Sequence, residues 1–247
     1  MGTGTFERLA AEGTAHTLAG SHARESPPVE GAPRWPVSCL LLPKGDLASH
    51  LDAVTGEAGR LAGDTHWRTG ARGFAHVTVR ALEHHRAQVA ADDETVARYG
   101  AALRRAAARC GPVSLRVAGL ILTPATLMAC ATQVDGSADR LAVAFAEELG
   151  VDGWREGGFR RDIWYVNLLH LSGDVAHPRP LVDWVAARRH LPLGEMTATE
   201  AHLARYRWVD GPALRGMQPV VLERVPLADP VTREVSRPGV DGPGVDR

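Results

Sequence analysis

Two histidines in this sequence are each followed, two residues later, by a hydroxyl side chain. The two sets are His76-x-Thr78 and His170-x-Ser172. Apolar and β-branched neighbours predict a strand for each set, and side chains two apart on a strand point to the same face. Each set would therefore present an imidazole and a hydroxyl side by side. Two imidazoles suit a phosphodiester, because one takes a proton from the attacking oxygen while the other donates a proton to the leaving oxygen.

The hydroxyls complete this chemistry, since they can donate to the phosphoryl oxygens on which charge accumulates. No step in such a scheme requires a metal. A three-residue pattern can arise by chance in a chain with 11 histidines. A second match on an equivalent strand of a similar half favours function over chance.

The paired motifs resemble the two-histidine (2H) phosphoesterase superfamily, which includes RNA 2',3'-cyclic phosphodiesterases and the proteins called 2'-5' RNA ligases. The resemblance covers roughly residues 36–225. It implies two α+β lobes that each contribute one motif to a concave cleft, with His76, Thr78, His170 and Ser172 as the catalytic set. It further implies opening of a cyclic phosphate without a metal or another cofactor. The second motif departs from the family: Ser replaces the commoner Thr, the chain turns sooner, and neither motif follows a proline.

Arginines near the motifs are candidates for phosphate contacts. Arg72 lies four residues before His76, and the pair Arg160-Arg161 precedes His170. A guanidinium at the rim of a cleft can bind phosphate oxygens through two parallel hydrogen bonds. Ordinary solvated arginines are the alternative for all three.

Aromatic residues near the motifs are candidates for stacking on a base. Strand parity places Phe74 on the face of His76 and Trp164 on the face of His170, whereas Tyr165 falls on the opposite face. Core packing is the alternative for each. We therefore expect Phe74 and Trp164, together with the arginines, to form the substrate-binding set.

The elements that must position these residues alternate between strands and helices. Hydrophobic periodicity and turn residues predict strands at 36–42, 74–79, 113–122, 126–133, 163–171, 197–208 and 213–224, and helices at 46–62, 92–109, 137–149 and 180–190. This order predicts an α+β fold of two pseudo-symmetric lobes, with antiparallel sheets around a central cleft and helices on the outside. We expect residues 1–34 to be a flexible extension, 35–226 the bilobal domain and 227–247 a flexible tail.

Charge and composition limit the partners. The chain has 28 basic and 29 acidic residues, so no bulk field attracts a long nucleic acid or an anionic membrane. Lys44 is the only lysine, and no glycine-rich phosphate loop surrounds it, which disfavours nucleoside triphosphate hydrolysis. The expected partner is a small nucleotide or an RNA terminus that bears a cyclic phosphate, bound by a monomer.

Other site classes have little support in the sequence. The three cysteines form no C-x-x-C pair, His84-His85 forms no metal-binding pattern with an acidic residue, and no G-x-S-x-G elbow occurs. We therefore expect no metal. No leader segment and no run of eighteen apolar residues is present, so the expected location is the cytoplasm.

Two alternatives stay open on the same cleft. One is a non-catalytic protein that binds a nucleotide or a phosphorylated metabolite. The other is a biosynthetic enzyme that uses the two imidazoles on a different substrate. The sequence also leaves open which cyclic phosphate is used, whether the reaction is hydrolysis or ligation, and which histidine is the acid.

Overall fold

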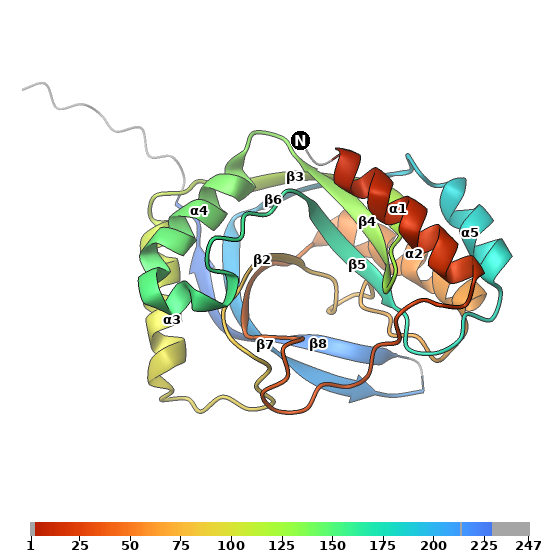
Figure 1. Cartoon of the computed structure of the whole chain (residues 1–247). Coiled ribbons are helices and arrows are strands. Elements are labelled where there is room, and N and C mark those ends of the chain that lie inside the picture. Colours follow the sequence, from red (N-terminus) through yellow and green to blue (C-terminus); the bar gives the residue numbers. More distant parts are fainter. Residues whose placement is uncertain (1–2, 213, 229–247) are drawn as a thin grey trace, which may run out of the picture.

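Two four-stranded sheets, both fully antiparallel, dominate the structure (Figure 1). It is a computed structural model that describes residues 3–212 and 214–228. In spatial order, the first sheet consists of β2 (Val77–Ala81), β1 (Ser38–Leu41), β7 (Glu200–Asp210) and β8 (Arg215–Pro226). The second sheet consists of β5 (Trp164–His170), β4 (Thr126–Gln133), β3 (Val113–Leu122) and β6 (Pro192–Ala198). The expected α+β class with two antiparallel sheets is thereby confirmed.

Helices flank the sheets in two groups. Figure 1 places α1, α2 and α5 on one side of the view and α3 and α4 on the other. Their bounds are α1 Thr3–Leu18, α2 Gly45–Ala62, α3 Glu94–Ala107, α4 Ser137–Leu149 and α5 Pro178–Ala186, with a 3-10 helix, η1, at Gly150–Glu156. The apolar stripes predicted from helical periodicity face the core: Leu51 of α2, Leu103 of α3 and Leu141 of α4 are fully buried.

The last two strands return to the first sheet, where β7 pairs with β1. The first sheet therefore takes its strands from both ends of the domain, and the second sheet takes its strands from the segment between them. Strand β6 was not expected as a separate element. It pairs with β3 at the edge of the second sheet and begins at Pro192, a residue that edge strands tolerate because no ladder partner needs its missing N–H.

The N-terminal segment forms a helix, α1, that the sequence did not predict. Helix α1 packs on β3 so closely that a Cβ added at Gly13 would lie 2.3 Å from the carbonyl carbon of Leu122. Residues 19–36, here called the strap, then run past the β3–β4 turn and the end of β5 toward β1. The Ala23 N–H donates to the Pro124 carbonyl (2.7 Å), and the Glu25 N–H donates to the Leu171 carbonyl (2.6 Å).

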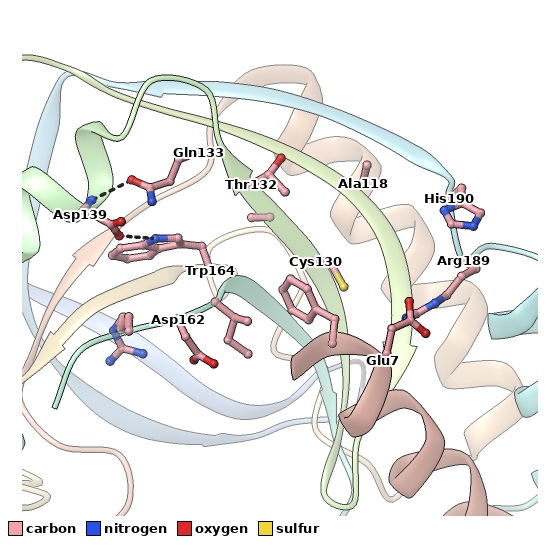
Figure 2. A pocket seen from close by; sticks show the side chains of 14 residues that line it. Glu7, Ala118, Cys130, Thr132, Gln133, Asp139, Asp162, Trp164, Arg189 and His190 are labelled. Carbon is pink, nitrogen blue, oxygen red and sulfur yellow. Dashed lines mark hydrogen bonds and ion pairs between the residues drawn. The ribbon is translucent and has the colours of Figure 1, made fainter. Parts of the chain in front are cut away.

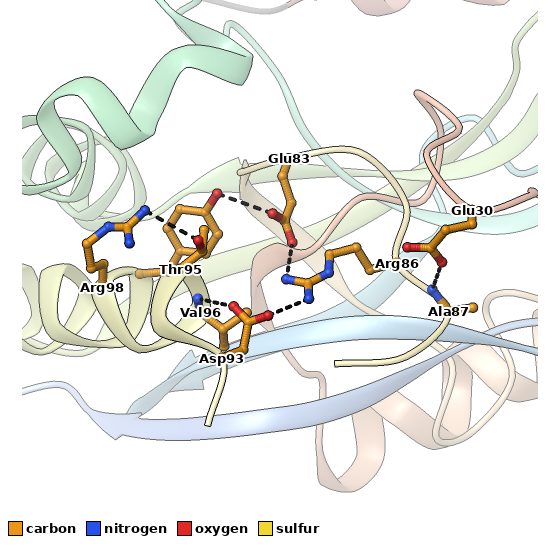
Figure 3. A network of polar contacts seen from close by, with 9 residues as sticks. Glu30, Glu83, Arg86, Ala87, Asp93, Thr95, Val96 and Arg98 are labelled. Atoms are coloured by element: carbon orange, nitrogen blue, oxygen red, sulfur yellow. Dashed lines mark hydrogen bonds and ion pairs between the residues drawn. The ribbon is translucent and has the colours of Figure 1, made fainter. Parts of the chain in front are cut away.

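A polar network joins the strap to the start of α3 (Figure 3). Asp93 caps α3 by accepting a hydrogen bond from the Val96 N–H (2.9 Å), and it also pairs with Arg86. The carboxylate of Glu30 in the strap accepts the Ala87 N–H (2.8 Å). Glu30 thus bonds the strap to the loop between β2 and α3, and Arg86 bonds that loop to the first turn of α3.

Several other expectations concern the surface and the ends of the chain. Across residues 3–212 and 214–228, no helix combines the length and the apolar character needed to cross a membrane. Cys39, Cys110 and Cys130 are free thiols. The expected flexible tail at 227–247 lies, from residue 229 onward, outside the described residues.

Candidate active site

His76 and His170 line the same cavity, which has a volume of about 260 Å³. The first sheet contributes His76, just before β2, together with Thr78 of β2 and Tyr206 of β7. The second sheet contributes His170, the last residue of β5, and Asn167. The cavity therefore lies between the two sheets, as expected for a central cleft.

The imidazole of His76 is held at both nitrogens. Its Nδ1 lies 2.8 Å from the Phe74 carbonyl oxygen, and its Nε2 lies 3.0 Å from the Tyr206 hydroxyl. A carbonyl can only accept, so Nδ1 carries the hydrogen. Burial raises the pKa of Tyr206, which keeps the phenol protonated. The Tyr206 hydroxyl therefore donates to Nε2 of the neutral imidazole.

His170 is fixed by its backbone and by a threonine. Its N–H and carbonyl pair with the carbonyl and N–H of Trp67, both at 3.0 Å. Its Nδ1 lies 3.0 Å from the Thr69 hydroxyl, and that hydroxyl donates to the Asn167 carbonyl at 3.2 Å. Because the single Thr69 hydrogen is used there, Nδ1 of His170 donates to Thr69. Nε2 then carries the lone pair and has no hydrogen-bond partner in the described part of the chain.

Both imidazoles are neutral near pH 7. Burial lowers the pKa of His76, and the hydrogen bond to the Phe74 carbonyl partly offsets this because it favours the charged form. Burial lowers the pKa of His170 well below its ordinary value, and the positive charges of Arg34 and of a protonated His76 lower it further.

An aromatic cluster packs around His170. The ring of Trp35 lies 4.7 Å from the ring of His170 and 5.2 Å from the ring of Tyr206. Trp67 packs on Trp35 at 5.9 Å and is 1% exposed. The backbone of Trp35 has φ +61°, a conformation that is rare for a bulky residue. The strap thus inserts one strained aromatic residue between the two sheets.

Three arginines line the cavity. Arg34 of the strap pairs with Glu25 (2.6 Å), and Arg161 donates to the Val79 carbonyl (3.0 Å) and to Glu156 (2.9 Å). Arg155 donates to the Pro33 carbonyl at 2.5 Å and forms no ion pair with a carboxylate in the described residues. Of the three, Arg155 therefore offers the positive charge that an anionic ligand needs, since Arg34 and Arg161 are paired with carboxylates.

Three of the four motif residues line the cavity, and the fourth, Ser172, does not. Thr78 lines the cavity with His76 and His170. Ser172 lies two residues beyond the end of β5, outside the cavity. Its hydroxyl donates to the Thr65 carbonyl (2.5 Å), and its N–H donates to Nδ1 of His66 (3.1 Å).

A β-bulge corrects the expected position of Trp164. In the ladder with β4, Asn167 pairs with Met128 and Leu169 with Leu127, so Leu168 is an extra residue that reverses the parity of β5. As a result Trp164 faces away from His170, and the prediction that they share a face is wrong. Trp164 instead borders a separate cavity of about 490 Å³, where its Nε1 donates to Asp139 at 3.1 Å (Figure 2).

The bulge also corrects the position of Tyr165, which was expected on the opposite face and instead lines the cavity with His170. Three other predicted binding residues lie outside this cavity. Arg72 donates to Ser49 (2.7 Å), Phe74 is 3% exposed in the interior, and Arg160 borders another surface cavity. Of the five predicted binding residues, the structure brings only Arg161 to the histidines.

The sequence reasoning missed several cavity residues: Arg34, Trp35, Arg155, Asn167 and Tyr206. Three of them had a visible signal. Arg34 and Trp35 stand between two prolines at the junction of the expected extension and the expected domain, and Asn167 is the only carboxamide in its strand. Tyr206 had none, since it meets His76 only through the pairing of distant strands. The described residues contain no group of three or more His, Cys, Asp or Glu side chains placed to hold a metal ion.

Comparisons with known proteins give matches at the level of structure. No family model and no curated protein matches the sequence. The structure of TT0787 from Thermus thermophilus aligns with a TM-score of 0.57 at 18% identity, covering 78% of this chain and 98% of that one. The structure of E. coli LigT complexed with 3'-AMP aligns with a TM-score of 0.52 at 15% identity, covering 79% of this chain and 99% of that one. The chain therefore has the fold of LigT and TT0787.

Proposed function

We propose that this protein is a phosphodiesterase of the two-histidine type, which opens a 2',3'-cyclic phosphate or a similar small phosphodiester. One observation carries the proposal: His76 and His170 line one cavity, and a protein oxygen engages Nδ1 of each ring. Nε2 of His170 is free for proton transfer, whereas Nε2 of His76 becomes free only when the Tyr206 hydroxyl, which donates to it in the free protein, turns away. The LigT fold, solved in one case with 3'-AMP, supports a substrate of the nucleotide type.

In the proposed reaction, the oxygen of a water molecule bonds to phosphorus while one ring P–O bond breaks. One imidazole takes the proton that water loses, and the other, as imidazolium, donates a proton to the leaving oxygen. The product is a phosphomonoester with a free hydroxyl. Exchange of protons with solvent then restores both rings, and each transfer contributes on the order of a hundredfold to ten-thousandfold to the rate.

We assign His170 as the base and His76 as the acid. The pKa of His170 is held well below its ordinary value, so His170 is neutral and its Nε2 lone pair is free to accept a proton. His76 is the ring that takes up the second proton, because the Phe74 carbonyl favours its charged form; the Tyr206 hydroxyl, which donates to Nε2 of the neutral ring, must turn away when that proton is bound. The negative charge of a bound phosphodiester raises the pKa of a nearby imidazole, which supplies the proton when the substrate binds.

The remaining cavity residues fit a small anion. Thr78 can donate its hydroxyl to a phosphoryl oxygen, and Arg155 offers a guanidinium that no carboxylate neutralises among the described residues. A volume of about 260 Å³ suits a nucleotide end rather than a long chain, and a net charge of -1 agrees with that choice. The proposed partner is thus a small nucleotide or an RNA terminus.

The test is hydrolysis of 2',3'-cyclic nucleotides by purified protein in excess chelator. We expect turnover in the wild type and a loss of at least a hundredfold in kcat for His76→Ala and for His170→Ala. Gln88→Leu, at the exposed surface, is the control. Full activity of either histidine variant contradicts the mechanism. Tight binding of the nucleotide without turnover would instead favour the non-catalytic binder.

A further inference from the structure

The sequence motif predicts a Ser172 hydroxyl beside His170 in the cavity, but the structure places none there. Thr78 faces the cavity beside His76, but the Ser172 hydroxyl is occupied by the Thr65 carbonyl, outside the cavity. A phosphoryl group held between the two imidazoles would therefore find a side-chain hydroxyl of the motif on one side only.

Asn167 occupies the position beside His170. The bulge at Leu168 puts Asn167 and His170 on the same face of β5, opposite Met128 and Thr126 of β4, and both line the cavity. Thr69 links them further, since its hydroxyl bridges the Asn167 carbonyl and Nδ1 of His170. Asn167 is also the only asparagine in the chain.

The carboxamide of Asn167 has one polar atom free to meet a ligand. Its Oδ1 is buried and has no hydrogen-bond partner, so solvent and ligand do not reach it. The residue is nevertheless partly exposed and borders the cavity, which leaves Nδ2 as the polar atom on that side. An amide N–H₂ group only donates, and a phosphoryl oxygen only accepts.

We propose that the Asn167 side-chain amide donates a hydrogen bond to a non-bridging phosphoryl oxygen of the substrate, the task that the motif assigns to Ser172. The inference rests on the proposed function and names a further contact of that same site. Asn167 exchanges no proton in the reaction. Negative charge grows on the non-bridging oxygens as water attacks, so a fixed donor binds the transition state more strongly than the ground state.

A direct test uses the single asparagine. Protein labelled with ¹⁵N-asparagine gives one pair of side-chain amide signals in an NMR spectrum. Titration with inorganic phosphate should shift this pair saturably, with the same midpoint as the quenching of Trp fluorescence that accompanies binding. A pair that stays fixed while fluorescence reports binding overturns the proposal.

Kinetics supply the second test. Asn167→Leu, similar in size without a donor, should lower kcat for a 2',3'-cyclic nucleotide about a hundredfold and change KM much less. Asn167→Asp should be worse, because a carboxylate repels the phosphodiester, and Asn167→Ser should recover part of the loss by restoring a donor. Gln88→Leu, an amide removed from the exposed surface, is the control. Thermal unfolding of each variant verifies the fold.

The outcomes separate this inference from the proposed function. If no cyclic nucleotide is turned over but phosphate shifts the Asn167 amide, the contact stands and the proposed reaction fails. If turnover is normal and Asn167→Leu keeps kcat within about threefold while Ser172→Ala loses it, the reaction stands and the contact is wrong.

Discussion

The Tyr206 hydroxyl lies 3.0 Å from Nε2 of His76, although the two residues are 130 positions apart in the chain. The phenol is 2% exposed, and burial raises its pKa, so it meets the imidazole as a hydrogen-bond donor. A donor on Nε2 stabilises the neutral ring and opposes its protonation. Strand β7 thereby sets the protonation state of a residue that precedes β2.

The first prediction concerns this contact. Tyr206→Phe should raise the pKa of His76, since the neutral ring loses a hydrogen bond that the charged ring does not receive. NMR titration of the imidazole signals measures the change. Loss of one hydrogen bond should also lower the free energy of unfolding by about 1 kcal/mol. An unchanged or lowered His76 pKa would contradict the proposed direction of this hydrogen bond.

The second prediction separates the acid from the base. A phosphodiester with a p-nitrophenolate leaving group needs no proton on the leaving oxygen, so loss of the acid should matter little for it. We expect the fold-loss in kcat caused by His76→Ala to be at least tenfold smaller on such a substrate than on a 2',3'-cyclic nucleotide. His170→Ala should be equally impaired on both. If His170→Ala were instead the less impaired variant on the p-nitrophenyl substrate, His170 would be the acid and His76 the base.

Much of the fold could be predicted because local patterns are strong in those parts. The hairpin of β3 and β4 lies at 113–122 and 126–133, as expected, and helix α4 occupies the predicted 137–149. These elements have clear periodicity and clear turns. Helix α1 was missed because its sequence is weakly amphipathic, and its stability comes from close packing of Gly13 on β3.

The site was less predictable, for two physical reasons. Strand parity fails at the bulge, so Trp164 was expected in the cavity, where Asn167 and Tyr165 are found instead. The sequence of an apolar strand does not reveal where a bulge occurs. Contacts between distant segments also follow from topology rather than local pattern, which is why neither Arg34, in the expected flexible extension, nor Trp35, at the start of the expected domain, was predicted to line the cavity.

The third prediction concerns Trp35, which the strap holds at φ +61°. Its Nε1 donates to Glu25 (3.1 Å), its carbonyl accepts from His85 (2.9 Å), and its ring packs on His170. Trp35→Ala should lower the free energy of unfolding by roughly 3–5 kcal/mol, as for other buried tryptophans. Urea unfolding monitored by circular dichroism measures this loss.

Trp154→Ala is the matched control, because Trp154 is 55% exposed and should contribute less than about 1 kcal/mol. Equal effects of the two substitutions would mean that Trp35 does not anchor the strap.

The fourth prediction concerns stability in acid. Four histidines that are buried or half-buried, His66, His76, His170 and His202, have a pKa below the ordinary 6.5, with burial as the largest cause of each shift. The unfolded chain therefore binds more protons than the folded chain as the pH falls through 6.5, and stability is lost in that direction. Between pH 7.5 and 5.5 each histidine lowers the free energy of unfolding by at most about 1.4 kcal/mol.

Urea unfolding at several pH values measures this slope. Glu83, whose pKa is raised by burial, opposes the trend at the acid end, whereas Asp93 titrates at a pKa of about 2 and does not contribute in this range. His66→Gln should flatten the slope by up to one proton, because the glutamine can still accept the Ser172 N–H without titrating. Stability that rises from pH 7.5 to 5.5 would mean that these histidines are charged in the folded chain, and the neutral base assigned to His170 would then be wrong.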